Sequence, residues 1–248
     1  MAVELRSLTG RSSLAATVEL LRRVRRLHPT AGVWEAADFE WWWRTPRPSD
    51  DWDRPFWFDN DGPIATAALT TWRSTVGLDV ITLPGAPPDH VTDVHRTGLE
   101  LAHQLDARHL EVMVDDTDAV AQSVLAGTGF APTRERGTSA WMPAESRPPI
   151  TATPPGYRLV SRAERRDVEH HYVARVGPDV EARLGQTSMY RADLDLAITD
   201  TSTGDVVADA LFWFDPITHV GFVEPMGTDE THRRRGLARH LLTNGLDR

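Results

Sequence analysis

Near the end of the chain, two apolar runs are followed by leucines at regular spacing. The runs Val206–Phe214 and Val220–Glu224 are rich in β-branched and aromatic residues and are separated by the turn sequence Asp215–Thr218. They therefore predict a β-hairpin. The leucines that follow recur at helical spacing, at Leu237, Leu241, Leu242 and Leu246. The pattern predicts strand, turn, strand, loop and helix in that order.

The first half of the chain repeats this order. Ile64–Leu69 and Val76–Ile81 predict two strands, and His95–Glu100 follows them in the place that Arg233–Ala238 takes in the second half. A repeat of this length indicates tandem domains, not a solenoid. The patterns around it predict a strand at Val3–Leu8, a helix capped by Ser12 or Ser13, a helix at Val91–Leu105, a strand at His109–Val114, a helix at Asp118–Ala126 and a strand at Arg134–Met142.

A proline-rich stretch separates the two copies. Five prolines lie between Met142 and Gly156, and few apolar residues accompany them. Such a segment continues neither a helix nor a central strand. We therefore expect a first domain at 1–142, a stiff linker at 143–156 and a second domain at 157–248.

Three consecutive arginines precede the predicted last helix. A helix N-terminus already carries a partial positive charge, so cations there are unfavourable unless an anion lies among them. The glycine that follows leaves backbone N–H groups open to such a ligand. The stretch therefore predicts a phosphate-binding loop, and its alternative is a solvated basic helix end. Its residues are Arg233, Arg234, Arg235, Gly236, Leu237 and Ala238.

The Arg-x-x-Gly-x-Ala spacing at 233–238, preceded by a hairpin, resembles the pyrophosphate-binding loop of the GNAT superfamily of N-acetyltransferases. The resemblance covers most of the chain. It implies an α+β fold of two tandem GNAT-like domains, each with a mixed, mainly antiparallel sheet flanked by helices. It also implies that 233–238 bind the pyrophosphate of acetyl-CoA, and that Met226, Gly227 and Thr228 meet its pantetheine and phosphates. Against the family pattern, the second domain is expected to end early, after its third helix.

The first copy differs from the second at positions that would meet a phosphate. His95 and Glu100 stand where the second copy has Arg233 and Ala238. A carboxylate beside a pyrophosphate is strongly unfavourable in a partly desolvated site. We therefore expect a degenerate first domain that has lost cofactor binding and serves as scaffold, lid or partner surface.

The resemblance implies an acyltransferase that passes an acetyl group directly from acetyl-CoA to a primary amine of a small molecule or peptide. The amine proton needs a base or a relayed water, and the oxyanion needs a backbone donor. Glu224, on the predicted strand before the loop, is the candidate catalytic residue, with a surface glutamate as the alternative. Two other interpretations stay open: a non-catalytic acyl-CoA-binding or interaction protein, and a purely structural pair of degenerate domains.

Composition narrows the classes of partner. The chain has no cysteine, which excludes disulfides and thiolate metal sites, and no apolar run has the length of a membrane span. The net charge of −9 argues against nucleic acid as the main partner. We expect a cytoplasmic protein that needs neither a metal nor a membrane, with a homodimer possible.

Four further features are expected to have structural roles and not roles in catalysis or ligand binding. Trp41–Trp43 indicate core or a domain interface, with an aromatic cage for a cation left open. Asp115, Asp116 and Asp118 fit a strand end and a helix N-cap better than a metal site, which needs a longer set of alternating ligands. His219 fits a turn, with a weaker candidacy as the base. His170 and His171, predicted on one helix, are adjacent and so do not share a face as zinc ligands do.

Overall fold

The computed structural model describes residues 3–248, which fall into two compact units. Unit 1 comprises the chain up to Phe39 together with Pro46–Ala140, and unit 2 comprises Glu40–Thr45 together with Trp141–Arg248. The stretch predicted as a linker, 143–156, lies in unit 2, where Ala144–Ser146 form a 3₁₀ turn. Within residues 3–248, no helix combines the length and the apolar character that crossing a bilayer requires.

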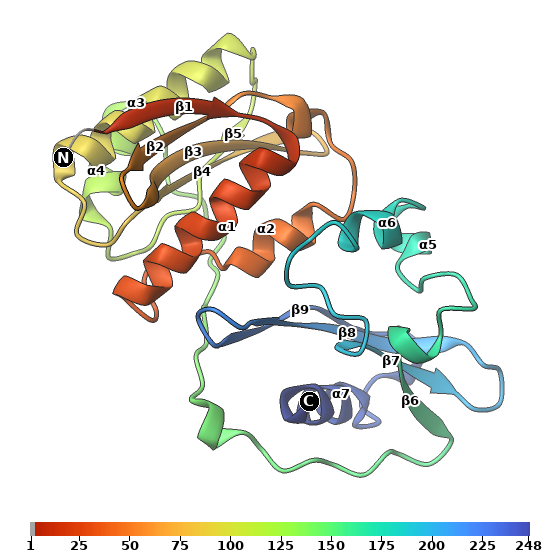
Figure 1. Cartoon of the computed structure of the whole chain (residues 1–248). Coiled ribbons are helices and arrows are strands. Elements are labelled where there is room, and N and C mark those ends of the chain that lie inside the picture. The colour runs from red at the N-terminus through yellow and green to blue at the C-terminus, as the bar shows by residue number, and fades with distance from the viewer. Residues whose placement is uncertain (1–2) are drawn as a thin grey trace. The chain divides into compact units, whose positions relative to one another are not determined.

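Unit 1 is built around a five-stranded sheet (Figure 1). Its strands are β1 (Glu4–Leu8), β2 (Arg54–Asp59), β3 (Gly62–Trp72), β4 (Thr75–Thr82) and β5 (Leu110–Glu111), and they lie in this order across the sheet. The first four strands are antiparallel, whereas β5 joins β4 in parallel. The helices are α1 (Gly10–Leu27), α3 (Pro88–Gln104), α4 (Ala119–Gly127) and the first half of α2 (Ala36–Trp42), whose residues from Glu40 onward belong to unit 2.

Both faces of this sheet are covered because β3 is apolar on both sides. Ala65, Ala67 and Leu69 alternate along β3 and pack with Leu78 of β4 and Val94 of α3. On the other face lies the amphipathic helix α1, which contacts β3 and β4. Its predicted apolar positions are confirmed as buried, at Leu14, Val18, Leu21 and Val24.

Unit 2 contains a four-stranded antiparallel sheet. Its strands are β6 (Tyr157–Ser161), β7 (Asp195–Asp200), β8 (Val206–Asp215) and β9 (Val220–Thr228), again in sequence order across the sheet. The helices are α5 (Val173–Val176), α6 (Val180–Leu184) and α7 (Leu237–Asp247). The predicted hairpin and last helix are therefore confirmed, and so is the turn role of His219, which has a φ of 59°.

Helix α7 covers one face of the sheet of unit 2 (Figure 1). Leu237 and Leu241 pack against Ile198 of β7 and Phe212 of β8. Gly245 permits this approach, because a Cβ there would lie 2.1 Å from Cζ of Phe212. The proline-rich stretch is held to the same helix, since the backbone N–H of Thr151 donates to Oγ1 of Thr243 at 3.2 Å and Oγ1 of Thr153 lies 3.1 Å from Nε2 of His240.

The segment Glu40–Thr45 is part of unit 2 although it precedes most of unit 1 in sequence. The buried carboxylate of Glu40 accepts hydrogen bonds from the backbone N–H of Ser188 at 2.8 Å and of Met189 at 2.9 Å, and from the Ser188 hydroxyl at 2.6 Å. Trp43 Nε1 donates to Oε1 of Gln186 at 2.9 Å. Trp41 and Trp43 are buried, which confirms the predicted core role for these two residues.

Several predicted elements of unit 1 are wrong or shorter than expected. Arg134–Met142 form no strand, because these largely polar residues are exposed and have no apolar face to bury. The strand predicted at His109–Val114 is reduced to Leu110–Glu111. Helix α1 begins at Gly10, so Thr9 and not Ser12 or Ser13 occupies the N-cap position. The N-cap role of Asp118 is confirmed, since its side chain accepts from the backbone N–H of Ala121.

Candidate functional site

The loop between β9 and α7 presents backbone N–H groups at a helix N-terminus. Arg234 and Gly236 both have left-handed backbone conformations, with φ of 61° and 84°. Gly236 is the N-cap of α7, and a Cβ at this position would meet no atom within 4 Å. No backbone carbonyl of residues 3–248 accepts from the N–H of Arg234, Arg235 or Gly236. Together with the first N–H groups of the helix, these donors form an open, positively polarised end.

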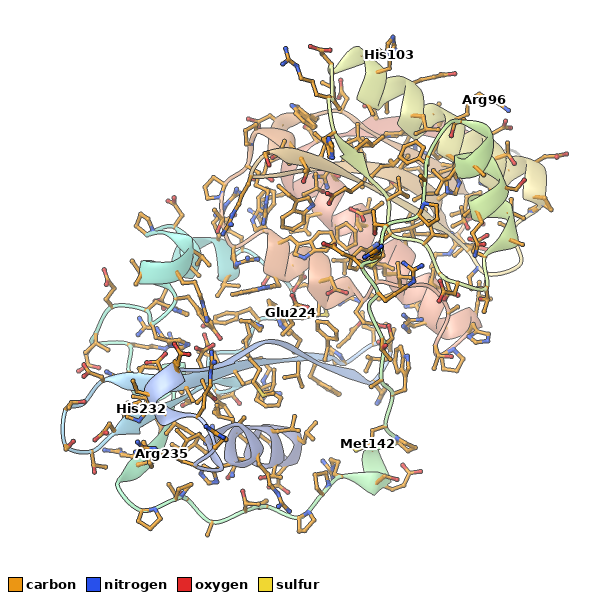
Figure 2. The ribbon with its side chains drawn as sticks, turned by 180° about the vertical axis from the view of Figure 1, so that it is seen from behind. Arg96, His103, Met142, Glu224, His232 and Arg235 are labelled. Atoms are coloured by element: carbon orange, nitrogen blue, oxygen red, sulfur yellow. The ribbon has the colours of Figure 1, made fainter. Side chains whose placement is uncertain are left out.

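Tyr157 fixes this loop from the first strand of the unit. Its hydroxyl accepts from Nη1 of Arg235 at 2.8 Å and lies 3.0 Å from Nδ1 of His232. Nη2 of Arg235 also donates to the backbone carbonyl of Thr231 at 3.0 Å. Figure 2 shows His232 and Arg235 at the same end of unit 2. The guanidinium of Arg235 is therefore engaged in holding the loop.

Arg233 connects the loop to the end of β9 and remains open to solvent. Its Nε donates to the backbone carbonyl of Thr228 at 3.3 Å, and the nearest carboxylate oxygen, on Glu230, is 3.9 Å away. The Arg233 side chain is 62% exposed. The structure therefore brings two of the predicted cofactor residues, Arg233 and Thr228, together, and it leaves the cationic group accessible.

Strand β9 carries a bulge next to the free edge of the sheet. Phe212 pairs with Val223 and Ala210 pairs with Met226, so β9 contains one residue more than β8 between these pairs. Inside the bulge, the carbonyl of Glu224 accepts from Nε1 of Trp213 at 2.8 Å. Within the described chain, β9 pairs with β8 alone. Its outer edge therefore offers unpaired backbone groups to a ligand.

The predicted strand residues differ in their surroundings. The Glu224 side chain is half-buried and Met226 is exposed. Gly227 is covered on one side by the Arg175–Asp209 ion pair, because a Cβ at this position would lie 3.4 Å from Nη1 of Arg175. The Thr228 hydroxyl is buried and has no hydrogen-bond partner in residues 3–248. Glu224 thus lies at the bulge, four residues before the strand end that meets the loop.

No family model and no curated protein sequence matches the chain, whereas solved structures match over nearly its whole length. A GCN5-related N-acetyltransferase from Sphaerobacter thermophilus shares 17% identity, with 98% of this chain and 81% of that chain covered and a TM-score of 0.54. A tandem GNAT protein from the clavulanic acid biosynthesis pathway shares 14% identity, with 99% and 85% covered and a TM-score of 0.58. The chain has the tandem GNAT fold. At these identities the likeness establishes the architecture, and it confirms the predicted α+β class.

The first copy of the GNAT fold lacks the loop that the sequence pattern predicted. His95–Glu100 do not precede a helix but lie inside α3, which begins at Pro88. Gly98 serves packing, because a Cβ there would lie 2.7 Å from Cδ1 of Leu78, and Figure 2 shows Arg96 on the body of this helix. The correspondence of His95–Glu100 with Arg233–Ala238 is therefore wrong.

The N-terminus of α3 is the position in unit 1 that corresponds to the arginine loop. Its N-cap is Pro87 and its first residue is Pro88, and neither has a backbone N–H. Two of the donors that an anion would use at a helix N-terminus are thus missing.

A buried cluster in the second GNAT-like unit was missed by the sequence analysis. His170 and His171 lie at a turn and not on a helix, and both imidazoles face Asp195 at the start of β7. Burial alone would raise the pKa of the Asp195 carboxyl, but the two imidazoles outweigh it and hold the pKa at about 2. Tyr190 also donates to Oδ2 of Asp195, at 2.9 Å. The spacing of these residues in the sequence gives no signal that they converge.

Proposed function

We propose that the chain is an acetyl-CoA-dependent N-acetyltransferase that binds its cofactor on unit 2 and transfers the acetyl group to a primary amine. The open, arginine-flanked N-terminus of α7 is the observation that carries the proposal. A pyrophosphate there would accept from N–H groups that have no backbone partner and would be attracted by the exposed Arg233 guanidinium. The fold, shared with N-acetyltransferases, supports the same cofactor.

The roles within the loop differ from residue to residue. Arg233 and Arg234 are exposed and supply charge to the ligand, whereas Arg235 positions the loop through Tyr157. Gly236 and Ala238 leave space for the phosphates. Leu237 is buried in the core of unit 2, so it contributes its backbone N–H and anchors the helix.

We propose that the pantetheine arm of acetyl-CoA binds along the free edge of β9. An amide-containing chain can add to a free strand edge by backbone hydrogen bonds, as extended peptides do. Met226, Gly227 and Thr228 lie on this strand between the bulge and the arginine loop. This path leads the thioester to the bulge, where the oxyanion that forms during transfer needs a backbone N–H donor. Pro225 in the bulge has no N–H, so the proposed donor is a neighbouring residue of β9.

Glu224 is the proposed general base. Its side chain is half-buried at the bulge, beside the proposed position of the thioester. The amine must lose a proton as it attacks the thioester carbon, and a carboxylate accepts it directly or through one water. The amine nitrogen forms the new C–N bond, the C–S bond breaks, and coenzyme A leaves as the thiol.

The cofactor is proposed to bind to unit 2 and not to unit 1 because the N-termini of α7 and α3 differ in the backbone N–H groups that they offer. Gly236 opens α7, whereas Pro87 and Pro88 open α3. We propose that unit 1 is degenerate with respect to cofactor binding, because these two prolines remove backbone donors at the start of α3. His95 and Glu100 do not contribute to that argument.

The test uses one substitution in both units. Gly236 and Gly85 have nearly equal φ, 84° and 80°, and an added side chain meets no atom within 4 Å at either position. We expect saturating acetyl-CoA to raise the Tm of the parent protein and of Gly85→Glu by several degrees, and to leave that of Gly236→Glu unchanged, because a carboxylate would occupy the phosphate position. A retained shift in Gly236→Glu would show that the cofactor binds elsewhere.

A second measurement separates the enzyme from a binding protein. Release of the coenzyme A thiol is followed against a panel of small-molecule and peptide amines. Acetyl-CoA binding with amine-dependent thiol release supports the transferase. Binding without release on any amine of the panel favours the non-catalytic acyl-CoA-binding protein.

A further inference from the structure

Three side chains in unit 2 converge with the donor set of a metal site. The ligating atoms of His170, His171 and Asp195 all lie within 4.8 Å of one another. Nε2 of His170 lies 3.0 Å from Oδ2 of Asp195, and Nε2 of His171 lies 3.3 Å from Oδ1. The two imidazole rings are stacked, with centroids 4.8 Å apart and an interplanar angle of 27°. Each ring thus faces its own oxygen of the same carboxylate.

These close approaches are not satisfied hydrogen bonds. Nε2 of His170, Nε2 of His171 and Oδ1 of Asp195 are buried and have no hydrogen-bond partner of acceptable geometry in the part of the chain that is described. The side chains of His170 and Asp195 are 1% and 0% exposed. Ligands at about 2.1 Å around a tetrahedral ion are separated by about 3.4 Å. The two nitrogen–oxygen distances are close to that value. The three ligating atoms as a set lie within 4.8 Å of one another, so the side chains would have to draw closer for all three atoms to bind one ion.

We propose that His170, His171 and Asp195 bind a divalent transition-metal ion of the Zn²⁺ class. Two imidazole nitrogens and one carboxylate oxygen suit Zn²⁺ or Co²⁺, whereas Mg²⁺ and Ca²⁺ prefer oxygen ligands throughout. The side chain of His171 is 11% exposed and is therefore the side from which the ion enters. Three protein ligands leave a coordination position for water.

The neighbouring groups orient the ligands. The Tyr190 hydroxyl donates to Oδ2 of Asp195 at 2.9 Å and so fixes the carboxylate, as outer hydrogen bonds do in metal sites. The backbone N–H of Tyr172 donates to Nδ1 of His170 at 3.2 Å. Ligation through Nε2 of His170 would place the ring proton on Nδ1 and would break this hydrogen bond.

The ion would fasten an irregular segment to the sheet of unit 2. Asp195 is the first residue of β7. The two histidines lie in the connection between β6 and β7, which contains a 3₁₀ turn at Arg162–Glu164 and the short helices α5 and α6. None of the three ligands is a proposed cofactor residue. The inference is thus independent of the proposed acetyl transfer, and it differs from the sequence-based expectation of a protein without a metal.

The experiment uses the full chain without a histidine tag, stripped with EDTA and desalted. We expect equimolar ZnCl₂ to raise the Tm and to bind one ion per chain in a calorimetric titration. CoCl₂ should give visible d–d absorption of a four- or five-coordinate ion, and MgCl₂ should change neither signal. Absence of both the zinc-dependent Tm shift and the cobalt absorption would overturn the proposal and leave a metal-free polar cluster.

Matched variants locate the ion. His171→Gln removes the least buried ligand and is expected to weaken Zn²⁺ binding at least tenfold, and Asp195→Asn is expected to do the same. His103→Gln, on the exposed surface of α3 (Figure 2), should bind as the parent does. If Asp195→Asn fails to fold, His171→Gln still decides the matter. Unchanged affinity in His171→Gln would overturn the assignment.

Discussion

The hydroxyl of Tyr157 lies 2.8 Å from Nη1 of Arg235 and joins the first strand of unit 2 to the loop that opens its last helix. The two residues are 78 positions apart in the sequence. The same oxygen lies 3.0 Å from Nδ1 of His232, whose ring meets the Tyr157 ring edge-on. One side chain of β6 thus holds two residues of the connection between β9 and α7.

Removing this hydroxyl should weaken cofactor binding. Tyr157→Phe keeps the ring contact with His232 but leaves Arg235 without its side-chain acceptor. We expect the Kd for acetyl-CoA, measured by calorimetry, to rise about 5- to 20-fold, equivalent to the loss of one charge-assisted hydrogen bond. Tyr190→Phe, which removes a hydroxyl from the Asp195 cluster, is the control and should bind acetyl-CoA normally. An unchanged Kd in Tyr157→Phe would mean that the loop is positioned without it.

Glu224→Gln tests the proposed base. The substitution preserves shape and removes the ability to accept a proton, so kcat should fall about 10²- to 10⁴-fold while KM for acetyl-CoA stays within about twofold. Steady-state thiol release measures both constants. Glu230→Gln removes the same charge from a side chain that is 89% exposed near the loop and should retain kcat. Equal losses in the two variants would point to electrostatics instead of proton transfer.

The elements that the sequence predicted well are those specified by local patterns. The hairpin β8–β9 follows from two apolar runs joined by a turn sequence, helix α7 follows from helical apolar spacing, and the arginine loop is contiguous in sequence. The candidate residues from Met226 to Ala238 therefore fell on one strand end, one turn and one helix start. Their assigned roles stay predictions.

The features that were missed depend on contacts between distant residues. His170 and His171 meet Asp195 only because a turn, and not a helix, directs both rings to β7. The apparent repeat at His95–Glu100 failed for a related reason. Gly98 matches Gly236 in spacing, but a glycine is required there because Leu78 packs too closely to leave room for a Cβ. The residue type alone does not distinguish a glycine needed for packing from one needed in a loop.

Glu40→Gln should destabilise unit 2. One oxygen of the buried carboxylate accepts from Ser188 and the other from the backbone N–H of Met189, and an amide NH₂ would oppose one of these donors. We expect a loss of about 2 kcal/mol in the free energy of unfolding, measured with urea. Glu100→Gln, an exposed change on α3, is the control and should stay within about 0.5 kcal/mol of the parent. An unchanged free energy of unfolding in Glu40→Gln would show that these hydrogen bonds make no net contribution to stability.

Asp79 should make the stability of unit 1 depend on pH. Burial raises the pKa of its carboxyl to about 7, against the opposing effects of Arg54 and Trp34. The folded state therefore keeps a proton that the unfolded chain has already lost, and the free energy of unfolding should fall as pH rises from about 4 to about 7. Above that range the contribution is constant.

Asp79→Asn copies the protonated acid and should remove this dependence. It is expected to equal the parent near pH 4 and to exceed its stability by up to about 4 kcal/mol at pH 8. Denaturant unfolding across this range provides the measurement. Asp116→Asn, at an exposed position, is the control. Parallel curves for the parent and Asp79→Asn would contradict the prediction.

The membership of Glu40–Thr45 in unit 2 sets the order in which the protein can fold during synthesis. Glu40 and its partner Ser188 are 148 residues apart, a length that a ribosome adds in about 7 to 30 s. Throughout that interval Glu40, Trp41 and Trp43 lack the residues of unit 2 that bury them in the folded protein. A gene divided at the proline-rich stretch would also give a second half without these residues. A polypeptide that begins at the proline-rich stretch therefore lacks part of unit 2.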